Sequence, residues 1–173
     1  KLFGHRAEPY VELHSADANQ LGLKDADLVT IDNGSVVRLL VSDSVAQGEL
    51  FQPMHWSAPY ASAPLANSAT RGVVDPNSGQ PALKSARVFL EKYPAQWFGF
   101  GVAKETATLS FDYWATRPLN NGHSFECAGL AVPESWTELL RRFCDFDDRK
   151  FEVSSVTGTA ASSFRCVVTR NGK

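Results

Sequence analysis

The sequence predicts a mainly β fold, a small closed barrel with short helices, followed by a smaller α+β unit. Short apolar runs alternate with turns rich in Gly, Pro, Asn and Ser through residues 1–92, as is typical of β-strands in a compact domain. The run 35–41 is almost continuously apolar, and a strand of that kind is expected to be buried on both faces, as in a closed barrel. An apolar stripe at helical spacing follows Pro133, in the region 93–173.

The first strand and the first helix are predicted near the start of the chain. Residues 10–13 form a short strand candidate. Ser15 is expected to cap the helix that follows, because a serine hydroxyl can accept a hydrogen bond from an unpaired N–H group of the first turn. Asp17 places an acid in that turn, and Gly22 is expected at the C-terminal cap.

A hairpin and one further strand are predicted next. Residues 27–32 and 35–41 are expected to pair in antiparallel fashion around Asn33–Gly34, a dipeptide typical of a type I′ turn. Residues 49–52 form another strand candidate, which Pro53 ends because proline has no N–H group to donate to a neighbouring strand.

The stretch from residue 57 to residue 83 has no periodic apolar face. It is rich in Ala, Ser, Pro, Asn and Gly. A loop of this length inside a compact domain is usually functional or disordered. A strand is predicted to resume at 85–90, so the irregular stretch is held between two strands and is a candidate ligand-binding element.

Residues 93–173 are predicted to form a second unit of short strands and one helix. Its strand candidates are 97–102, 108–114, 124–130 and 164–169. The helix is expected to begin within Pro133–Trp136, with proline in the first turn. Its core-facing stripe consists of Trp136, Leu139, Leu140 and Phe143.

Composition and chain ends limit the class of protein. The 17 Lys and Arg residues are balanced by 19 Asp and Glu residues, which argues against a nucleic-acid surface. No apolar run approaches membrane-spanning length, and the 3 cysteines form no CxxC pair. We therefore expect a cytoplasmic protein with reduced thiols and no membrane passage. The chain starts at Lys1, and an Asn171–Gly172 turn precedes only Lys173, so we expect a piece of a longer protein.

Catalytic motifs are absent from the sequence. It contains no GxSxG, Walker A, HExxH or GxGxxG pattern, and its histidines lack metal-ligand spacing. The adjacent His14, Ser15 and Asp17 are interpreted as a helix cap rather than as a catalytic triad. We therefore expect neither catalytic residues nor metal ligands in this chain.

The loop from Gln52 to Lys84 is the strongest candidate binding element. Asn67 and Gln80 offer amide groups that can pair with the edge of a heterocycle, and Lys84 offers a positive charge for an anion. His55, followed by a tryptophan, could pack on a ring. The same stretch is also compatible with plain turns and a helix cap, and residue chemistry alone leaves both interpretations open.

Two stretches of the chain carry a family resemblance. They are EPYVELHSADANQLGLKDADLVTIDNGSVVRLLVSDSVAQGELFQPMHW and LANSATRGVVDPNSGQPALKSARV. Together they resemble the C-terminal molybdopterin dinucleotide-binding domain of the molybdenum oxidoreductases. The HW and SGQP segments and the aromatic residues after Tyr93 are most similar to the bacterial assimilatory nitrate reductases.

The resemblance implies a double-psi β-barrel over residues 1–92 that closes over bis-molybdopterin guanine dinucleotide. Asn67 matches the family's loop asparagine and Lys84 its lysine, while Gln80 and His55 fall in segments that border the cofactor. The chain departs from the family pattern in two turns, where Ser15 replaces proline and Ala26 replaces glycine.

The resemblance also implies what the parent enzyme would contribute. Its remaining domains would carry the molybdenum surroundings and an iron–sulfur cluster, and an electron donor protein or domain would supply electrons. The chain alone is then expected to be inactive in reducing nitrate to nitrite. The alternatives are a formate dehydrogenase or another molybdenum or tungsten oxidoreductase, and a non-enzymatic double-psi-barrel interaction module. The DPNSGQPALK segment counts against the last of these, because a docking barrel needs no nucleotide-binding stretch.

Overall fold

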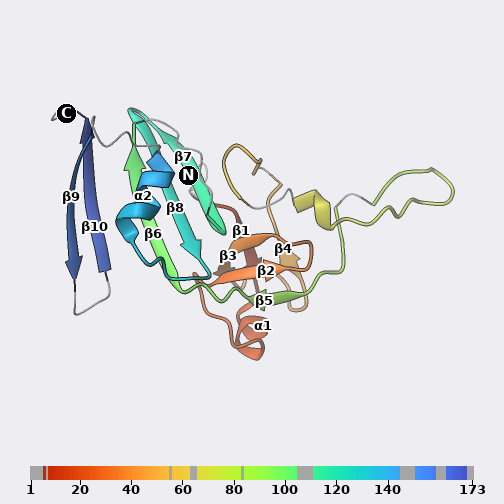
Figure 1. Cartoon of the computed structure of the whole chain (residues 1–173). Coiled ribbons are helices and arrows are strands. Elements are labelled where there is room, and N and C mark those ends of the chain that lie inside the picture. The colour runs from red at the N-terminus through yellow and green to blue at the C-terminus, as the bar shows by residue number, and fades with distance from the viewer. Residues whose placement is uncertain are drawn as a thin grey trace. The chain divides into compact units, whose positions relative to one another are not determined.

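The computed structural model divides the chain into two compact units (Figure 1). The first contains the described residues up to Lys104 together with Phe111–Ala131, and the second contains the described residues from Val132 onward. The residues that the structure describes are 6, 8–54, 56–62, 66–82, 84–104, 111–144, 151–158 and 163–170.

The first unit contains a five-stranded sheet in the order β4-β1-β3-β2-β5. Its elements are β1 (Tyr10–Leu13), α1 (Ser15–Gln20), β2 (Leu28–Ile31), β3 (Val36–Val41), β4 (Leu50–Phe51), the 3-10 helix η1 (Ala66–Ala69) and β5 (Leu90–Lys92). Strands β1 and β3 are parallel, with Tyr10 opposite Arg38, and the other pairs are antiparallel. The strands predicted at 10–13, 27–32, 35–41 and 49–52 are confirmed to within two residues at each end.

The core of this sheet is built from alternating apolar residues. The main cluster consists of Val11, Leu13, Ala18, Leu23, Val29, Ile31, Val37 and Leu39. Strand β2 is buried on both faces, because Leu28 packs with Tyr93 and Tyr113 in a second cluster. The sequence assigned burial on both faces to the 35–41 strand, and this is confirmed in part: Val37 and Leu39 are buried on one face of β3, while on the other face Val36 and Arg38 are half-buried, with Val36 packed against the second cluster.

Two local predictions near the ends of these elements are corrected. Helix α1 is capped by His14, whose Nδ1 accepts a hydrogen bond from the N–H of Ala16 at 3.0 Å, whereas the Ser15 hydroxyl donates to Asp43. The β2–β3 turn is not type I′, which needs a positive φ at both central residues. Of its residues only Gly34 has a positive φ, +84°, so the turn is a three-residue loop closed by the 2.9 Å bond from the Ile31 N–H to Ser35.

The first unit also contains a three-stranded antiparallel sheet in the order β6-β8-β7. Its strands are β6 (Trp97–Ala103), β7 (Tyr113–Leu119) and β8 (Gly122–Gly129). The predictions at 97–102 and 124–130 are confirmed. Of the strand expected at 108–114, residues 108–110 lie outside the described residues, and β7 begins at Tyr113. The strand expected at 85–90 is also displaced, since β5 begins at Leu90 and the preceding residues are mostly exposed.

The second unit contains helix α2 (Trp136–Cys144) and a hairpin of β9 (Phe151–Gly158) and β10 (Ser163–Arg170). The helix begins at Trp136, inside the predicted range, but Pro133 precedes it instead of lying in its first turn. The Ser135 hydroxyl accepts a hydrogen bond from the N–H of Glu138 at 3.3 Å. Trp136 stacks on Phe164 with ring centroids 6.1 Å apart. The strand predicted at 164–169 is confirmed, β9 was not anticipated, and the predicted turn at 171–172 lies outside the described residues.

The fold is therefore mainly β with few short helices, as the sequence predicts. The sheets formed by the described strands are open, so the closed barrel stays a prediction. No helix within the described part of the chain combines the length and the apolar character that a bilayer crossing requires.

Candidate functional site

Asn67 lies on η1, and one side-chain hydrogen bond joins η1 to the β2–β3 turn of the five-stranded sheet. The Asn33 side-chain amide in the β2–β3 turn donates to the Ser68 hydroxyl at 3.0 Å. The backbone carbonyl of Asn67 accepts hydrogen bonds from both the N–H and the hydroxyl of Thr70. The Asn67 side chain is exposed and has no hydrogen-bond partner among the described residues, so its amide is available to a ligand.

A small hairpin follows η1, between Val73 and Ala82. Val74 and Pro81 form a β-bridge, and the N–H of Asp75 donates to the carbonyl of Gln80 at 2.8 Å. One carboxylate oxygen of Asp75 accepts the N–H groups of Asn77 and Ser78 at 3.0 and 2.7 Å. These bonds hold the pKa of the Asp75 carboxyl below its usual value. The DPNSG segment is therefore an ordered turn rather than a featureless loop.

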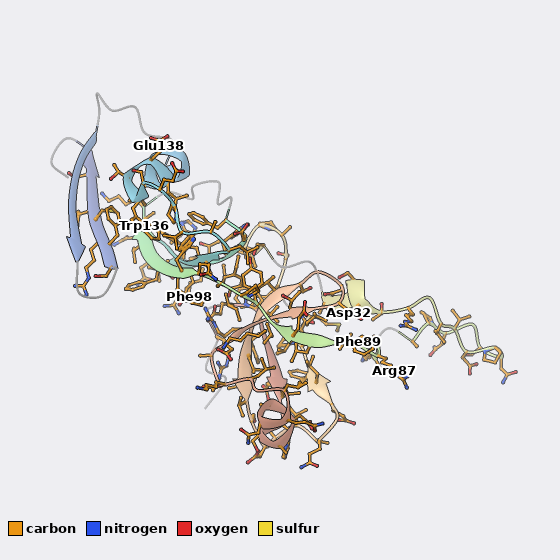
Figure 2. All side chains as sticks on the ribbon, turned by 60° about the horizontal axis from the view of Figure 1, so that its bottom comes forward. Asp32, Arg87, Phe89, Phe98, Trp136 and Glu138 are labelled. Atoms are coloured by element: carbon orange, nitrogen blue, oxygen red, sulfur yellow. The ribbon has the colours of Figure 1, made fainter. Side chains whose placement is uncertain are left out.

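Gln80 and Lys84 both belong to an exposed segment. We name the stretch from Arg71 to Arg87 the 71–87 loop; all of its described residues are exposed. In Figure 1 it runs away from the five-stranded sheet and returns at β5. Figure 2 labels Arg87 and Phe89 at this return, where the carbonyl of Phe89 accepts the N–H of Asp32 at 3.2 Å.

The structure places three of the four predicted site residues. Asn67, Gln80 and Lys84 lie on one continuous segment, and no hydrogen bond joins their side chains in the described structure. His55, the fourth, lies outside the described residues. A Cβ atom built on Gly72 or Gly79 would meet nothing within 4 Å, so the backbone beside these residues is open to an approaching ligand.

This donor set fits one chemical class of ligand. Free amides can pair with the polar edge of a heterocycle, and a lysine ammonium suits a phosphate group. Among the described residues, no group of three or more His, Cys, Asp or Glu side chains could hold a metal ion. The loop therefore suits an anionic ligand that carries heterocycles, such as a dinucleotide.

A buried polar cluster, which the sequence analysis missed, lies elsewhere in the same unit. The guanidinium of Arg38 binds both carboxylate oxygens of Glu8, at 3.0 and 2.9 Å. It also donates to the carbonyl of Ala26 at 3.0 Å, and the Tyr113 hydroxyl donates to Glu8. The one sequence signal for this cluster is an arginine inside an apolar strand, because a charge at such a position needs a partner.

The cluster shifts the titration of its members and lines a hollow. Burial and the neighbouring Glu8 carboxylate raise the pKa of Tyr113, and the same two causes raise the pKa of Glu126, 3.7 Å from Arg38. The hollow has a volume of about 380 Å³. Its lining comprises Arg6, Glu8, Asp25, Ala26, Arg38, Leu39, Phe98 and Glu126. None of the predicted site residues lines it, so it is separate from the 71–87 loop.

The two cysteines whose side chains the structure describes carry no site of their own. Cys127 and Cys166 are free thiols. Burial raises the pKa of the Cys127 thiol to about 12, and burial also raises the pKa of Cys166. Both are therefore poor nucleophiles at neutral pH, because the thiolate is the reactive form.

Fold and loop together define a class: a small mainly β domain that presents amides and a lysine on one exposed loop. Residues 2–87, about half of the chain, match the family described as "Molydopterin dinucleotide binding domain". This segment therefore belongs to the molybdopterin dinucleotide-binding domain family, as its resemblance to the molybdenum oxidoreductases predicts.

One curated relative extends the comparison beyond this segment. A nitrate reductase from Klebsiella oxytoca is 28% identical over 140 residues, which cover 79% of this chain. Those residues cover 16% of the relative, so the chain spans about one sixth of its length. No solved structure matches the chain significantly.

Proposed function

We propose that the chain is the C-terminal cofactor-binding part of a molybdenum-dependent nitrate reductase that acts in nitrate assimilation. The observation that carries the proposal is the coincidence of two features over residues 2–87. This segment matches a dinucleotide-binding family, and it contains an exposed loop whose free side chains suit such a ligand. The similarity to a nitrate reductase favours nitrate over formate as the substrate.

The cofactor in this proposal is bis-molybdopterin guanine dinucleotide. When bound, it would supply the molybdenum for the two-electron, two-proton reduction of nitrate to nitrite and water, with the electrons coming from the proposed electron donor. The chain's own residues hold and orient one end of the cofactor. Lys84 would neutralise phosphate charge, and Asn67 and Gln80 would pair with heterocycle edges. His55, which lies outside the described residues, is the fourth residue proposed to bind the cofactor.

The architecture proposed for residues 1–92 is the double-psi β-barrel, with residues 93–173 as a C-terminal extension. The parallel pairing of β1 and β3 supports it, because this connection passes through α1 and β2 and brings back a strand in the same direction. In a closed barrel, the edge strands β4 and β5, which each pair on one side only in the described sheet, would both gain a second pairing partner.

The proposed partners are the other domains of the parent enzyme and an electron donor, in the cytoplasm. The exposure of the 71–87 loop supports this, because a dinucleotide held by this loop alone would be covered on one side only. Without those domains and their iron–sulfur cluster, the isolated chain is expected to show no nitrate reduction.

The substrate is tested by assaying the purified parent enzyme. We expect nitrate to oxidise a chemically reduced dye in its presence, with one nitrite formed for every two electrons that the dye loses. We expect formate to reduce no oxidised dye. Formate oxidation without nitrate reduction would overturn the substrate assignment while leaving cofactor binding intact. A parent protein that contains neither molybdenum nor guanine nucleotide would overturn the proposal as a whole.

A further inference from the structure

The β2–β3 turn contacts the chain on both sides of the 71–87 loop. Before the loop, the side-chain amide of Asn33 donates to the Ser68 hydroxyl of η1 at 3.0 Å. After the loop, the N–H of Asp32 donates to the carbonyl of Phe89 at 3.2 Å, and β5 then pairs with β2. Figure 2 labels Asp32 and Phe89 at this point. The exposed loop therefore leaves and rejoins the five-stranded sheet beside a single turn (Figure 1).

The side chain of Asn33 uses both of its polar groups. Its Oδ1 accepts the N–H of Ser35 at 2.9 Å and so closes the turn, while its Nδ2 makes the bond to Ser68. Asn33 does not have a positive φ, so the backbone of the turn does not require asparagine here. An aspartate carboxylate could accept the Ser35 N–H equally well, but it has no N–H group to donate to η1. The link to η1 is therefore what the asparagine amide adds.

The link acts on the short helix that carries Asn67. Ser68 follows Asn67 directly in η1, and the N–H and hydroxyl of Thr70 donate to the Asn67 carbonyl at 3.1 and 2.7 Å. Those two bonds fix the shape of η1 but do not attach it to the sheet. Among the described residues, Asn33 supplies the side-chain hydrogen bond that does so. Asn33 is half-buried, whereas Asn67 and Ser68 are exposed, so the anchor lies on the sheet side of the link.

We propose that Asn33 is a positioning residue for the cofactor site, which holds η1 through Ser68 and so keeps the Asn67 amide in place before the cofactor binds. This inference rests on the proposed function, in which Asn67 pairs with a heterocycle edge. Binding is weakened by the cost of ordering the groups that contact the ligand. A bond that orders η1 in advance removes part of that cost. Its loss should therefore weaken retention of the cofactor without removing a group that touches it.

The first test uses no cofactor. The parent enzyme is produced in cells that cannot make the guanine dinucleotide, and hydrogen exchange is measured by mass spectrometry in the peptide that contains η1 and Thr70. Ser68→Ala should speed exchange of this peptide at least about threefold, because one hydrogen bond no longer opposes local opening. Ser68→Thr keeps a hydroxyl and should exchange like the wild type. Ser44→Ala, at an exposed serine outside the turn, is the matched control and should change nothing.

The second test measures how fast the loaded parent enzyme releases guanine nucleotide. Ser68→Ala and Asn33→Ala should each speed release about threefold to tenfold. The double variant should release the nucleotide no faster than Asn33→Ala alone, because both substitutions remove the same contact. Asn67→Ala should also speed release, since it removes the amide itself. Asn19→Ala, at an exposed asparagine of α1, is the control and should leave the rate unchanged.

The two tests together separate the positioning role from the proposed function. Unchanged exchange in Ser68→Ala, additive effects in the double variant, or failure of Ser68→Thr to behave like the wild type would each overturn the positioning role. If only Asn67→Ala released the nucleotide faster, the positioning role would be wrong while the assignment of Asn67 would stand. If instead Asn67→Ala itself retained the nucleotide like the wild type, its assignment in the proposed function would be wrong, and the positioning role with it.

Discussion

Val11, Val37 and Leu39 on the five-stranded sheet have no exposed surface, whereas every described residue of the 71–87 loop is exposed. Sheet residues are fixed by apolar packing and by the ion pair between Glu8 and Arg38. Loop residues are fixed by short-range hydrogen bonds, such as those accepted by Asp75. The difference indicates that the sheet determines stability, while the exposed polar groups of the loop are those that we propose to bind a ligand.

The largest difference between the two regions is expected on truncation of an apolar side chain. Leu39→Ala should lower the free energy of unfolding by about 3 kcal/mol, because it leaves a cavity in a closely packed core. Val73→Ala, at a position 58% exposed in the loop, should change it by less than about 0.5 kcal/mol. Urea unfolding followed by circular dichroism measures both. Equal losses would contradict the division of roles.

The buried ion pair gives a second contrast. Arg38→Met should cost about 2–3 kcal/mol, because Glu8 loses its charged partner in a half-buried site and the Tyr113 ring loses the guanidinium that lies over it. Arg87→Met, which removes an exposed arginine from the loop, is the control and should cost almost nothing. The double variant Glu8→Gln, Arg38→Met should lose less than the sum of the single losses. Strict additivity would show that the pair contributes nothing.

The stability of the sheet should also depend on pH, through the carboxyl group of Asp27. Burial opposes ionisation of this carboxyl, but the 2.9 Å hydrogen bond from Lys92 and the N–H of Lys24 outweigh it and lower its pKa. Because folding lowers the pKa of Asp27, its ionised carboxylate stabilises the fold at pH values above the unfolded-state pKa of about 3.9. That contribution is lost as the pH falls through the folded-state pKa.

Asp27→Asn should therefore destabilise the chain by about 1 kcal/mol at pH 7 and by much less near pH 2.5. The comparison of urea midpoints at the two pH values measures this. Asp32→Asn, an exposed position in the β2–β3 turn, serves as the control and should have little effect at either pH. If Asp27→Asn lowered the stability by the same amount at both pH values, the charge of the carboxylate would not contribute to stability.

The smallest expected effect concerns the turn at Ala26, just before strand β2. Ala26 has φ +67°, a left-handed conformation that costs a non-glycine residue free energy. Ala26→Gly should raise the free energy of unfolding by up to about 1 kcal/mol, since glycine adopts this conformation freely. Gly22→Ala, at the same φ of +67°, should lower it by a similar amount. A destabilising Ala26→Gly would show that the methyl group is needed for packing.

Much of the first sheet could be predicted from the sequence because its strands are short apolar runs between strong turn signals. The errors have local causes. His14 rather than Ser15 caps α1, since imidazole nitrogen and hydroxyl oxygen can both accept the N–H group. The strand expected at 85–90 begins only at Leu90, because the residues that pair with β2 decide where β5 starts. Composition does not reveal that pairing.

The candidate site stays a prediction, and the structure adds the local geometry that the sequence could not give. Family motifs indicate Asn67, Gln80 and Lys84 directly. The structure adds that all three are exposed, with Asn67 on a 3-10 helix, Gln80 in an ordered hairpin and Lys84 after that hairpin. Arg38 and its partners could not be found from the sequence, because Glu8 and Tyr113 are joined by a contact across 105 positions. The departure at Ala26 could be seen in the sequence, and the structure shows that alanine keeps the left-handed turn.

The most direct test of the central claim is the cofactor content of the purified parent enzyme with and without the lysine of the loop. Molybdenum and releasable guanine nucleotide are measured per polypeptide for wild type, Lys84→Ala and the control Lys24→Ala, an exposed lysine outside the loop. Lys84→Ala is expected to reduce both contents at least tenfold with the fold intact, and Lys24→Ala to leave them unchanged. Full occupancy by both components in Lys84→Ala would contradict the assignment of the 71–87 loop as the dinucleotide site.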